Sequence, residues 1–113
     1  MEKSVSRRGV MVGAAAFAAV LTPIASAAEN KVHEVEIESF EFEPAHVRVR
    51  LGDTIRWTNR DLAPHTATAD EFGWDTEELA QGESGDVIVT EGIETSYFCV
   101  FHPHMKGTIE VIS

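Results

Sequence analysis

Cysteine, methionine and long apolar runs are all scarce in this chain of 113 residues. Cys99 is the only cysteine, so no disulfide can form within the chain and none can stabilise the fold. No segment sustains a convincing helical period of apolar residues, and we find no linker, internal repeat or low-complexity tract. The apolar stretch at residues 9–20 is rich in Ala and Gly and is followed by Pro23, which makes it a poor membrane-spanning helix.

The N-terminus has the features of an export signal. Lys3, Arg7 and Arg8 precede the apolar stretch, and Ala25-Ser26-Ala27 offers a small-residue cleavage site. The segment around the two arginines resembles a twin-arginine signal, which is an address read by a receptor and not an anchor. We therefore predict a signal peptide at residues 1–27 and one domain at residues 28–113, located in the periplasm or another extracytoplasmic compartment. An uncleaved membrane anchor is the alternative.

Basic side chains are few in the predicted domain. Residues 28–113 hold six Lys and Arg against 18 Asp and Glu, a formal net charge of −12. Such acidity argues against nucleic acid or anionic lipid as partners and favours a partner protein with a basic patch. Lys31 and Lys106 are the only lysines of this domain, so adaptation to a salt-rich habitat is the alternative explanation.

Short strands separated by turn signals follow the predicted signal. Apolar residues alternate with polar ones in several segments, and Gly, Pro and Asp end most of them. The apolar parity changes between Ile37 and Phe40, which predicts a β-bulge around Glu38-Ser39. The pattern indicates an all-β protein, an antiparallel sandwich or barrel. The residues that mark the expected strands are Val35 and Ile37; Val47 and Val49; Ile55 and Trp57; Val87 and Val89; Tyr97 and Cys99; Ile109 and Val111.

The segment from Cys99 to Met105 contains three potential metal ligands. Cys99, His102 and Met105 supply a thiolate, an imidazole and a thioether, and His65 lies upstream in a Pro-His-Thr sequence. Two His, one Cys and a weak axial Met form the ligand set of a mononuclear blue-copper site, which passes single electrons. Zinc is chemically possible at two His and one Cys, but the thioether favours copper. We therefore predict one copper ion bound by His65, Cys99, His102 and Met105.

Several sequence segments resemble the cupredoxin family, which includes plastocyanin, pseudoazurin, amicyanin and the halocyanins. The two residues between His102 and Met105 are similar to the amicyanin spacing, whereas Thr66, Phe101 and His104 depart from the common residues at their positions. The resemblance implies a Greek-key β-sandwich of seven to eight strands, with copper at one end and His102 as the ligand nearest the surface. The segments that carry it are residues 40–44, 49–59 and 64–66, and Tyr97-Phe98-Cys99, His102-Pro103, Met105 and Gly107.

These features predict a monomeric shuttle of single electrons between redox partner proteins. The alternative is a periplasmic copper carrier or storage protein, although such proteins usually display several Met and His residues. We do not expect an enzyme, because a dinuclear copper centre needs a second Cys and a trinuclear one needs several His-x-His pairs. Asn59, Pro64 and Thr66 are candidates for orienting the ligands. His104 is interpreted as a solvent-facing neighbour of the site, and the alternative is that it is a ligand that completes a His-Pro-His pair.

Overall fold

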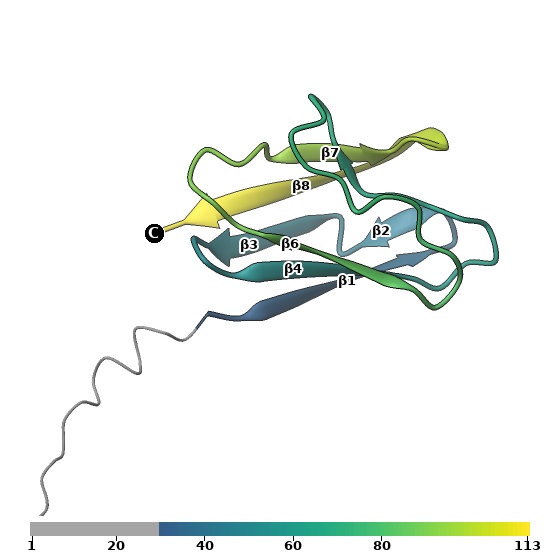
Figure 1. Cartoon of the computed structure of the whole chain (residues 1–113), viewed down its shortest axis with the longest axis horizontal. Coiled ribbons are helices and arrows are strands. Elements are labelled where there is room, and N and C mark those ends of the chain that lie inside the picture. The colour runs from purple at the N-terminus through teal and green to yellow at the C-terminus, as the bar shows by residue number, and fades with distance from the viewer. Residues whose placement is uncertain (1–29) are drawn as a thin grey trace, which may run out of the picture.

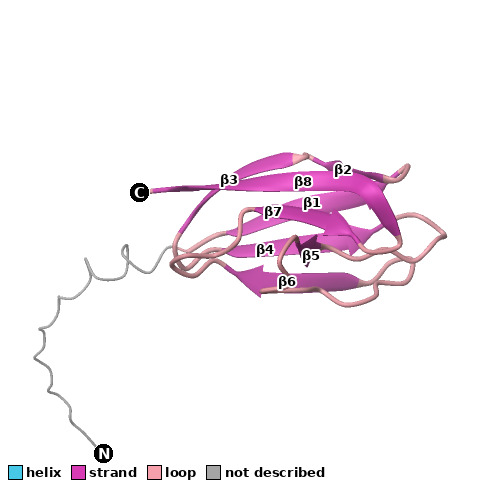
Figure 2. Cartoon of the chain, turned by 90° about the horizontal axis from the view of Figure 1, so that it is seen from above, coloured by secondary structure: helices cyan, strands magenta, loops and turns pink. Residues whose placement is uncertain are grey.

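The computed structural model describes residues 30–113, which form a sandwich of two β-sheets (Figures 1 and 2). One sheet has the order β2-β1-β4-β6 and the other β3-β8-β7-β5. The predicted all-β Greek-key sandwich of seven to eight strands is confirmed. The strands are β1 (Val32–Glu38), β2 (Glu41–Glu43), β3 (His46–Arg50), β4 (Thr54–Asn59), β5 (Thr68–Ala69), β6 (Ser84–Ile88), β7 (Ser96–Cys99) and β8 (His102–Ile112).

The predicted signal peptide at residues 1–27 lies outside the described residues. Within residues 30–113 there is no helix with the length and apolar character needed to cross a membrane.

Two strand pairs are parallel, which the expectation of a purely antiparallel sandwich missed. β1 pairs with β4 and β3 pairs with β8 in parallel register, while the remaining pairs are antiparallel. Parallel neighbours need a crossover connection and cannot be joined by a tight turn. Here the chain leaves β1, passes through β2 and then β3 in the opposite sheet, and returns to its first sheet at β4.

Alternating side chains of both sheets fill the space between them. In β3, for example, Val47 and Val49 are buried whereas His46, Arg48 and Arg50 are exposed. Trp57 on β4 is fully buried and stacks on Trp74 at 5.3 Å between ring centroids, so both tryptophans serve packing. The buried apolar core includes Val35, Ile37, Phe42, Val47, Val49, Ile55, Trp57, Leu79, Val89, Tyr97, Cys99, Met105 and Ile109.

The predicted bulge near Glu38-Ser39 is wrong, because the chain reverses direction there. Glu38 pairs with Glu41 across a two-residue hairpin turn made of Ser39 and Phe40. The turn carries the strand back antiparallel, so Ile37 and Phe42 become partners and both are buried. The change in apolar parity therefore arises from a tight hairpin turn, with Phe40 at its tip.

A second tight turn connects β7 to β8 and brings two predicted ligands together. Cys99 is the last residue of β7 and His102 the first of β8, and the two are direct cross-strand partners. The register then shifts, because Phe98 pairs with Lys106, and residues 103–105 are the extra residues of an irregular segment. This turn lies at the end of the sandwich opposite the C-terminus (Figure 1).

Candidate metal centre

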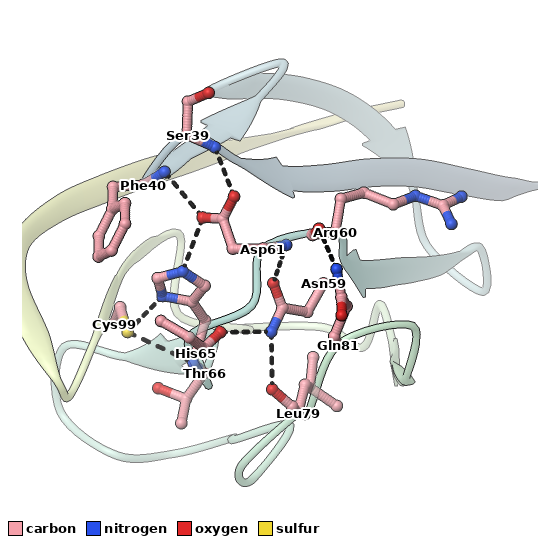
Figure 3. Close-up of polar contacts among 11 residues, drawn as sticks. Ser39, Phe40, Asn59, Arg60, Asp61, His65, Thr66, Leu79, Gln81 and Cys99 are labelled. Carbon is pink, nitrogen blue, oxygen red and sulfur yellow. Dashed lines mark hydrogen bonds and ion pairs between the residues drawn. The ribbon is translucent and has the colours of Figure 1, made fainter.

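His65 lies on the connection that follows β4, and a backbone bridge fixes its position. Its N–H donates to the Leu79 carbonyl at 3.2 Å, and the Leu79 N–H donates back to the His65 carbonyl at 2.8 Å. The Asn59 side chain braces the same connection, because its amide nitrogen donates to the carbonyls of Ala63 and Leu79 at 2.8 and 2.9 Å (Figure 3). These contacts hold the segment around His65, which is not part of a strand, in place.

The thiol of Cys99 is fully buried and faces the imidazole of His65. The Sγ atom lies 3.7 Å from His65 Nδ1 and 3.4 Å from the backbone nitrogen of Thr66, which donates toward the sulfur (Figure 3). His65 has no exposed surface. The Thr66 hydroxyl also accepts a hydrogen bond from the Val100 N–H at 3.0 Å, which ties the β7–β8 turn to the His65 segment.

Asp61 orients the ring of His65, and the sequence analysis did not single it out. Its carboxylate lies 2.9 Å from His65 Nε2, four residues further along the chain. With Nε2 facing a carboxylate, the neutral ring carries its proton there, and the Nδ1 lone pair points toward the thiol. The spacing Asp61-x-x-x-His65 was the available signal, but an acid four residues from a histidine is too common to single out by itself.

The same carboxylate fastens the β1–β2 turn. One Asp61 oxygen accepts the Ser39 N–H at 2.8 Å and the other accepts the Phe40 N–H at 2.9 Å (Figure 3). Burial raises the pKa of Asp61, but the N–H groups of Phe40 and Ser39 and the ring of His65 outweigh it, so this pKa lies below its ordinary value. Asp61 therefore stays ionised and joins the β1–β2 turn to the connection that follows β4.

His102 is the least buried of the four predicted ligands. Its ring centroid lies 5.2 Å from that of His65 and 6.4 Å from that of His104. His102 is half-buried and His104 exposed, whereas His65, Cys99 and Met105 are all buried. Met105 lies on β8 with 3% of its surface exposed and belongs to the same buried core as Cys99.

The four predicted ligands differ in how close they lie to one another. The structure brings His65 and Cys99 into contact, and it places His102 beside the His65 ring and Met105 on the strand that His102 begins. Within residues 30–113, no set of three or more His, Cys, Asp or Glu side chains is arranged closely enough to hold a metal by itself. The Met105 thioether, which is also in the predicted set, does not belong to these four side-chain types.

Among the residues expected to orient ligands, Asn59 and Thr66 make the contacts described above, while Pro64 is exposed and directly precedes His65. His33 is half-buried, with Nε2 at 2.8 Å from Asp53, far along the chain from the predicted ligands.

Comparison with known proteins gives the family of the chain. The family profile of the cupredoxin-like domain matches residues 11–111. The chain belongs to the cupredoxin family. Amicyanin of Paracoccus denitrificans is 27% identical to this cupredoxin over 82 residues, which cover 68% of the present chain and 63% of the amicyanin. Plastocyanin of Scenedesmus fuscus is 35% identical over 85 residues, covering 62% of the present chain and 85% of the plastocyanin. The chain thus spans less than two thirds of the Paracoccus amicyanins.

Solved structures give the same result for the fold. A Cu(I) form of an amicyanin variant superposes with a TM-score of 0.64 and 26% identity, covering 72% of this chain and 82% of the amicyanin. A purple cupredoxin from Nitrosopumilus maritimus superposes with a TM-score of 0.63 at 21% identity, covering 71% of this chain and 99% of that one.

Proposed function

We propose that this cupredoxin carries single electrons between redox partner proteins through one copper ion that alternates between Cu(I) and Cu(II). The observation that carries the proposal is the pairing of the buried Cys99 thiol with His65 Nδ1 at 3.7 Å, while Asp61 holds the other ring nitrogen. The two donor atoms face each other, and the Thr66 N–H lies 3.4 Å from the sulfur. The related amicyanin structure with Cu(I) supports copper as the metal.

The donor set suits copper in both oxidation states. Cys99, His65 and His102 would hold the metal through a thiolate and two imidazoles, and Met105 would add a weak thioether. Copper bound there would supply a one-electron redox couple. Two soft sulfur donors favour Cu(I) and the imidazoles suit Cu(II), so one rigid site can serve both states.

The protein matrix contributes burial and hydrogen bonds around the donors. The Thr66 N–H donates toward Sγ and stabilises negative charge on the sulfur. Complete burial of Cys99 and His65 excludes water, so solvent reorganisation on electron transfer is small. His102 is half-buried and reaches toward the surface, and we assign it as the exit for the electron.

The remaining parts of the proposal concern the setting in which the protein works. We propose that residues 1–27 direct export, that the domain at residues 28–113 acts as a monomer outside the cytoplasm, and that it is not an enzyme. Its redox partners would present basic patches to the acidic domain, as its formal net charge of −12 suggests. Nucleic acid and the membrane are not proposed as partners.

The visible absorption spectrum of the copper-loaded domain tests the function. We expect the Cu(II) form to be intensely coloured through its copper–sulfur bond, and Cys99→Ser to be colourless. Reversible voltammetry of the wild-type protein should show one electron per chain. Weak visible absorption with tightly bound Cu(II) would refute the ligand assignment, whereas intense colour without a reversible redox wave would favour the copper carrier.

A further inference from the structure

The phenyl ring of Phe40 contacts both predicted histidine ligands. Its centroid lies 5.0 Å from that of His65 at an interplanar angle of 90°, and 4.8 Å from that of His102 at 77°. These are edge-to-face arrangements, which are favourable between aromatic rings. Phe40 belongs to the β1–β2 turn, whereas the imidazoles come from two other parts of the chain. One side chain thus bridges the two rings from outside their own segments.

The backbone at Phe40 is unfavourable for this residue. Ser39 and Phe40 both have positive φ, 56° and 60°, which two-residue hairpins of type I′ require. Asn-Gly is the preferred sequence there, and a bulky residue in this region is strained. Such conformations persist where neighbouring structure enforces them, often at sites that clamp a ligand. Here the Asp61 carboxylate enforces the turn by accepting the N–H groups of both residues.

The two imidazoles differ in how they are held. His65 is buried, and a hydrogen bond from Nε2 to Asp61 fixes its ring. His102 is half-buried, and its ring neighbours are other rings, those of Phe40, His65 and His104. Its orientation therefore depends on packing, and Phe40 is the nearest of the three by centroid distance.

We propose that Phe40 is a positioning residue for the metal centre, whose ring keeps the His102 imidazole turned toward Cys99 and His65. The proposal rests on the proposed function for its significance but concerns a contact that exists without metal. Asp61 serves both histidines: it holds His65 by a hydrogen bond and His102 through the turn that presents Phe40. Loss of the phenyl ring should free the His102 ring to rotate outward, while Cys99 and His65 stay in contact.

The test compares Phe40→Leu with Phe72→Leu in the metal-free protein. Phe72 is a matched control, because it too is an exposed phenylalanine with positive φ, 64°, and its ring packs edge-to-face on another ring, that of Phe98. NMR side-chain couplings and ring relaxation report whether His102 occupies one rotamer. We expect averaged couplings for His102 in Phe40→Leu, and wild-type values for His65 in that variant and for both histidines in Phe72→Leu.

A single fixed rotamer of His102 in Phe40→Leu would overturn the proposal, and so would equal loosening in Phe72→Leu. The copper-loaded proteins give a second readout. Phe40→Leu should release Cu(I) to a chelator about threefold to tenfold faster, in line with the strength of aromatic pairs, and should shift the reduction potential. Unchanged release and potential would also count against the role of Phe40. Absence of intense colour in the wild type would refute the proposed function alone, leaving the metal-free comparison to decide the positioning role.

Discussion

Asp61 shows how much a single carboxylate can organise. It accepts hydrogen bonds from two backbone N–H groups of the β1–β2 turn and from the ring of His65. These contacts join the β1–β2 turn to the connection that carries His65. Groups that orient a metal ligand typically change metal affinity tenfold to a hundredfold when they are removed.

We predict that Asp61→Asn weakens copper binding by roughly tenfold to a hundredfold. The amide keeps the size of the side chain but has one acceptor oxygen, so it cannot serve all three donors. Asp86→Asn is the matched control, since Asp86 on β6 also accepts two hydrogen bonds, but from Arg56 on the neighbouring strand β4. Competition titration with a copper chelator provides the measurement. Equal affinities in the two variants would contradict the role of Asp61.

Met105 is the proposed weak ligand, so its substitution can separate redox tuning from metal retention. The side chain is buried on β8, and a weak axial ligand affects potential more than affinity. We predict that Met105→Gln retains copper and lowers the reduction potential, because a harder oxygen donor favours Cu(II). Voltammetry and copper analysis measure the two quantities. Loss of copper in Met105→Gln together with its retention in His102→Ala would reverse the assigned roles of these ligands.

At the scale of elements, β7 and β8 pack closely enough to require a glycine. Gly107 pairs with Tyr97, and a Cβ at position 107 would overlap the ring of Tyr97. That ring cannot move aside, because it is buried and packs against Phe42, Trp57 and Trp74. Burial also raises the pKa of Tyr97 to about 12, so the phenol is neutral at neutral pH.

We predict that Gly107→Ala lowers the free energy of unfolding by about 1–3 kcal/mol through overpacking. Chemical denaturation monitored by tryptophan fluorescence measures it. The cause is checked by a double-mutant cycle with Tyr97→Leu, in which the smaller side chain should remove most of the additional loss. Strict additivity of the two losses would show that the overlap with Tyr97 is not the cause.

The β3–β4 turn depends on Asp53. Its carboxylate accepts the N–H groups of Lys31 and Arg50 at 3.0 and 2.9 Å and contacts His33 at 2.8 Å. Burial raises the pKa of Asp53, but the Lys31 and Arg50 N–H groups and the His33 ring together lower it below its ordinary value. The turn and the start of β1 are therefore joined by an ionised group.

A pKa that is lower in the folded state means that the unfolded chain binds the proton more tightly. The stabilisation by Asp53 is complete above the ordinary carboxyl pKa, near 3.9, and is lost as pH falls through the lower folded pKa. We predict that Asp53→Asn is less stable at neutral pH and loses less stability between neutral and acidic pH than the wild type. Glu91→Gln, at an exposed turn position, removes the same charge as a control. Parallel pH profiles for Asp53→Asn and the wild type would refute this linkage.

At the scale of the whole molecule, the charges are distributed unevenly. Basic side chains on the β1–β4–β6 face are paired with acids: Arg56 with Glu34 and Asp86, and Arg60 with Glu36. Three of the six basic residues of the predicted domain, Arg48, Arg50 and Lys106, are exposed on strands β3 and β8 of the other sheet. The acidic excess therefore falls mainly on the first face and on the loops. The charge of the molecule is asymmetric as well as negative.

We predict that long-range charge governs electron-transfer rates. With a small cationic metal complex as the redox probe, the rate should fall as salt is added, because screening shortens the reach of the field. With an anionic complex of similar driving force it should rise. Stopped-flow kinetics over a range of ionic strength measure both slopes. Flat slopes with both probes would leave adaptation to a saline habitat as the better explanation of the acidity.

Much of the fold follows from local chemistry that is visible in the sequence. Alternation at Val47 and Val49 requires a strand with one buried face, and Cys99, His102 and Met105 are close in the chain, so their proximity needs no tertiary information. The segments that resemble cupredoxins predict the Greek-key sandwich. The parallel pairing of β1 with β4 could not be inferred from alternation, because a strand's pattern specifies which face is buried but not which neighbour it has.

The way in which distant segments meet at one end of the sandwich depends on the packing of the whole chain. The spacing of Asp61 and His65 is visible in the sequence, but their contact and its link to the β1–β2 turn depend on where the chain after β4 is folded. Phe40 is an ordinary apolar residue in the sequence, and only the hairpin makes it a neighbour of both imidazoles. The residue types supply the donor atoms, whereas the packing of the two sheets decides which of these atoms face one another and what holds them there.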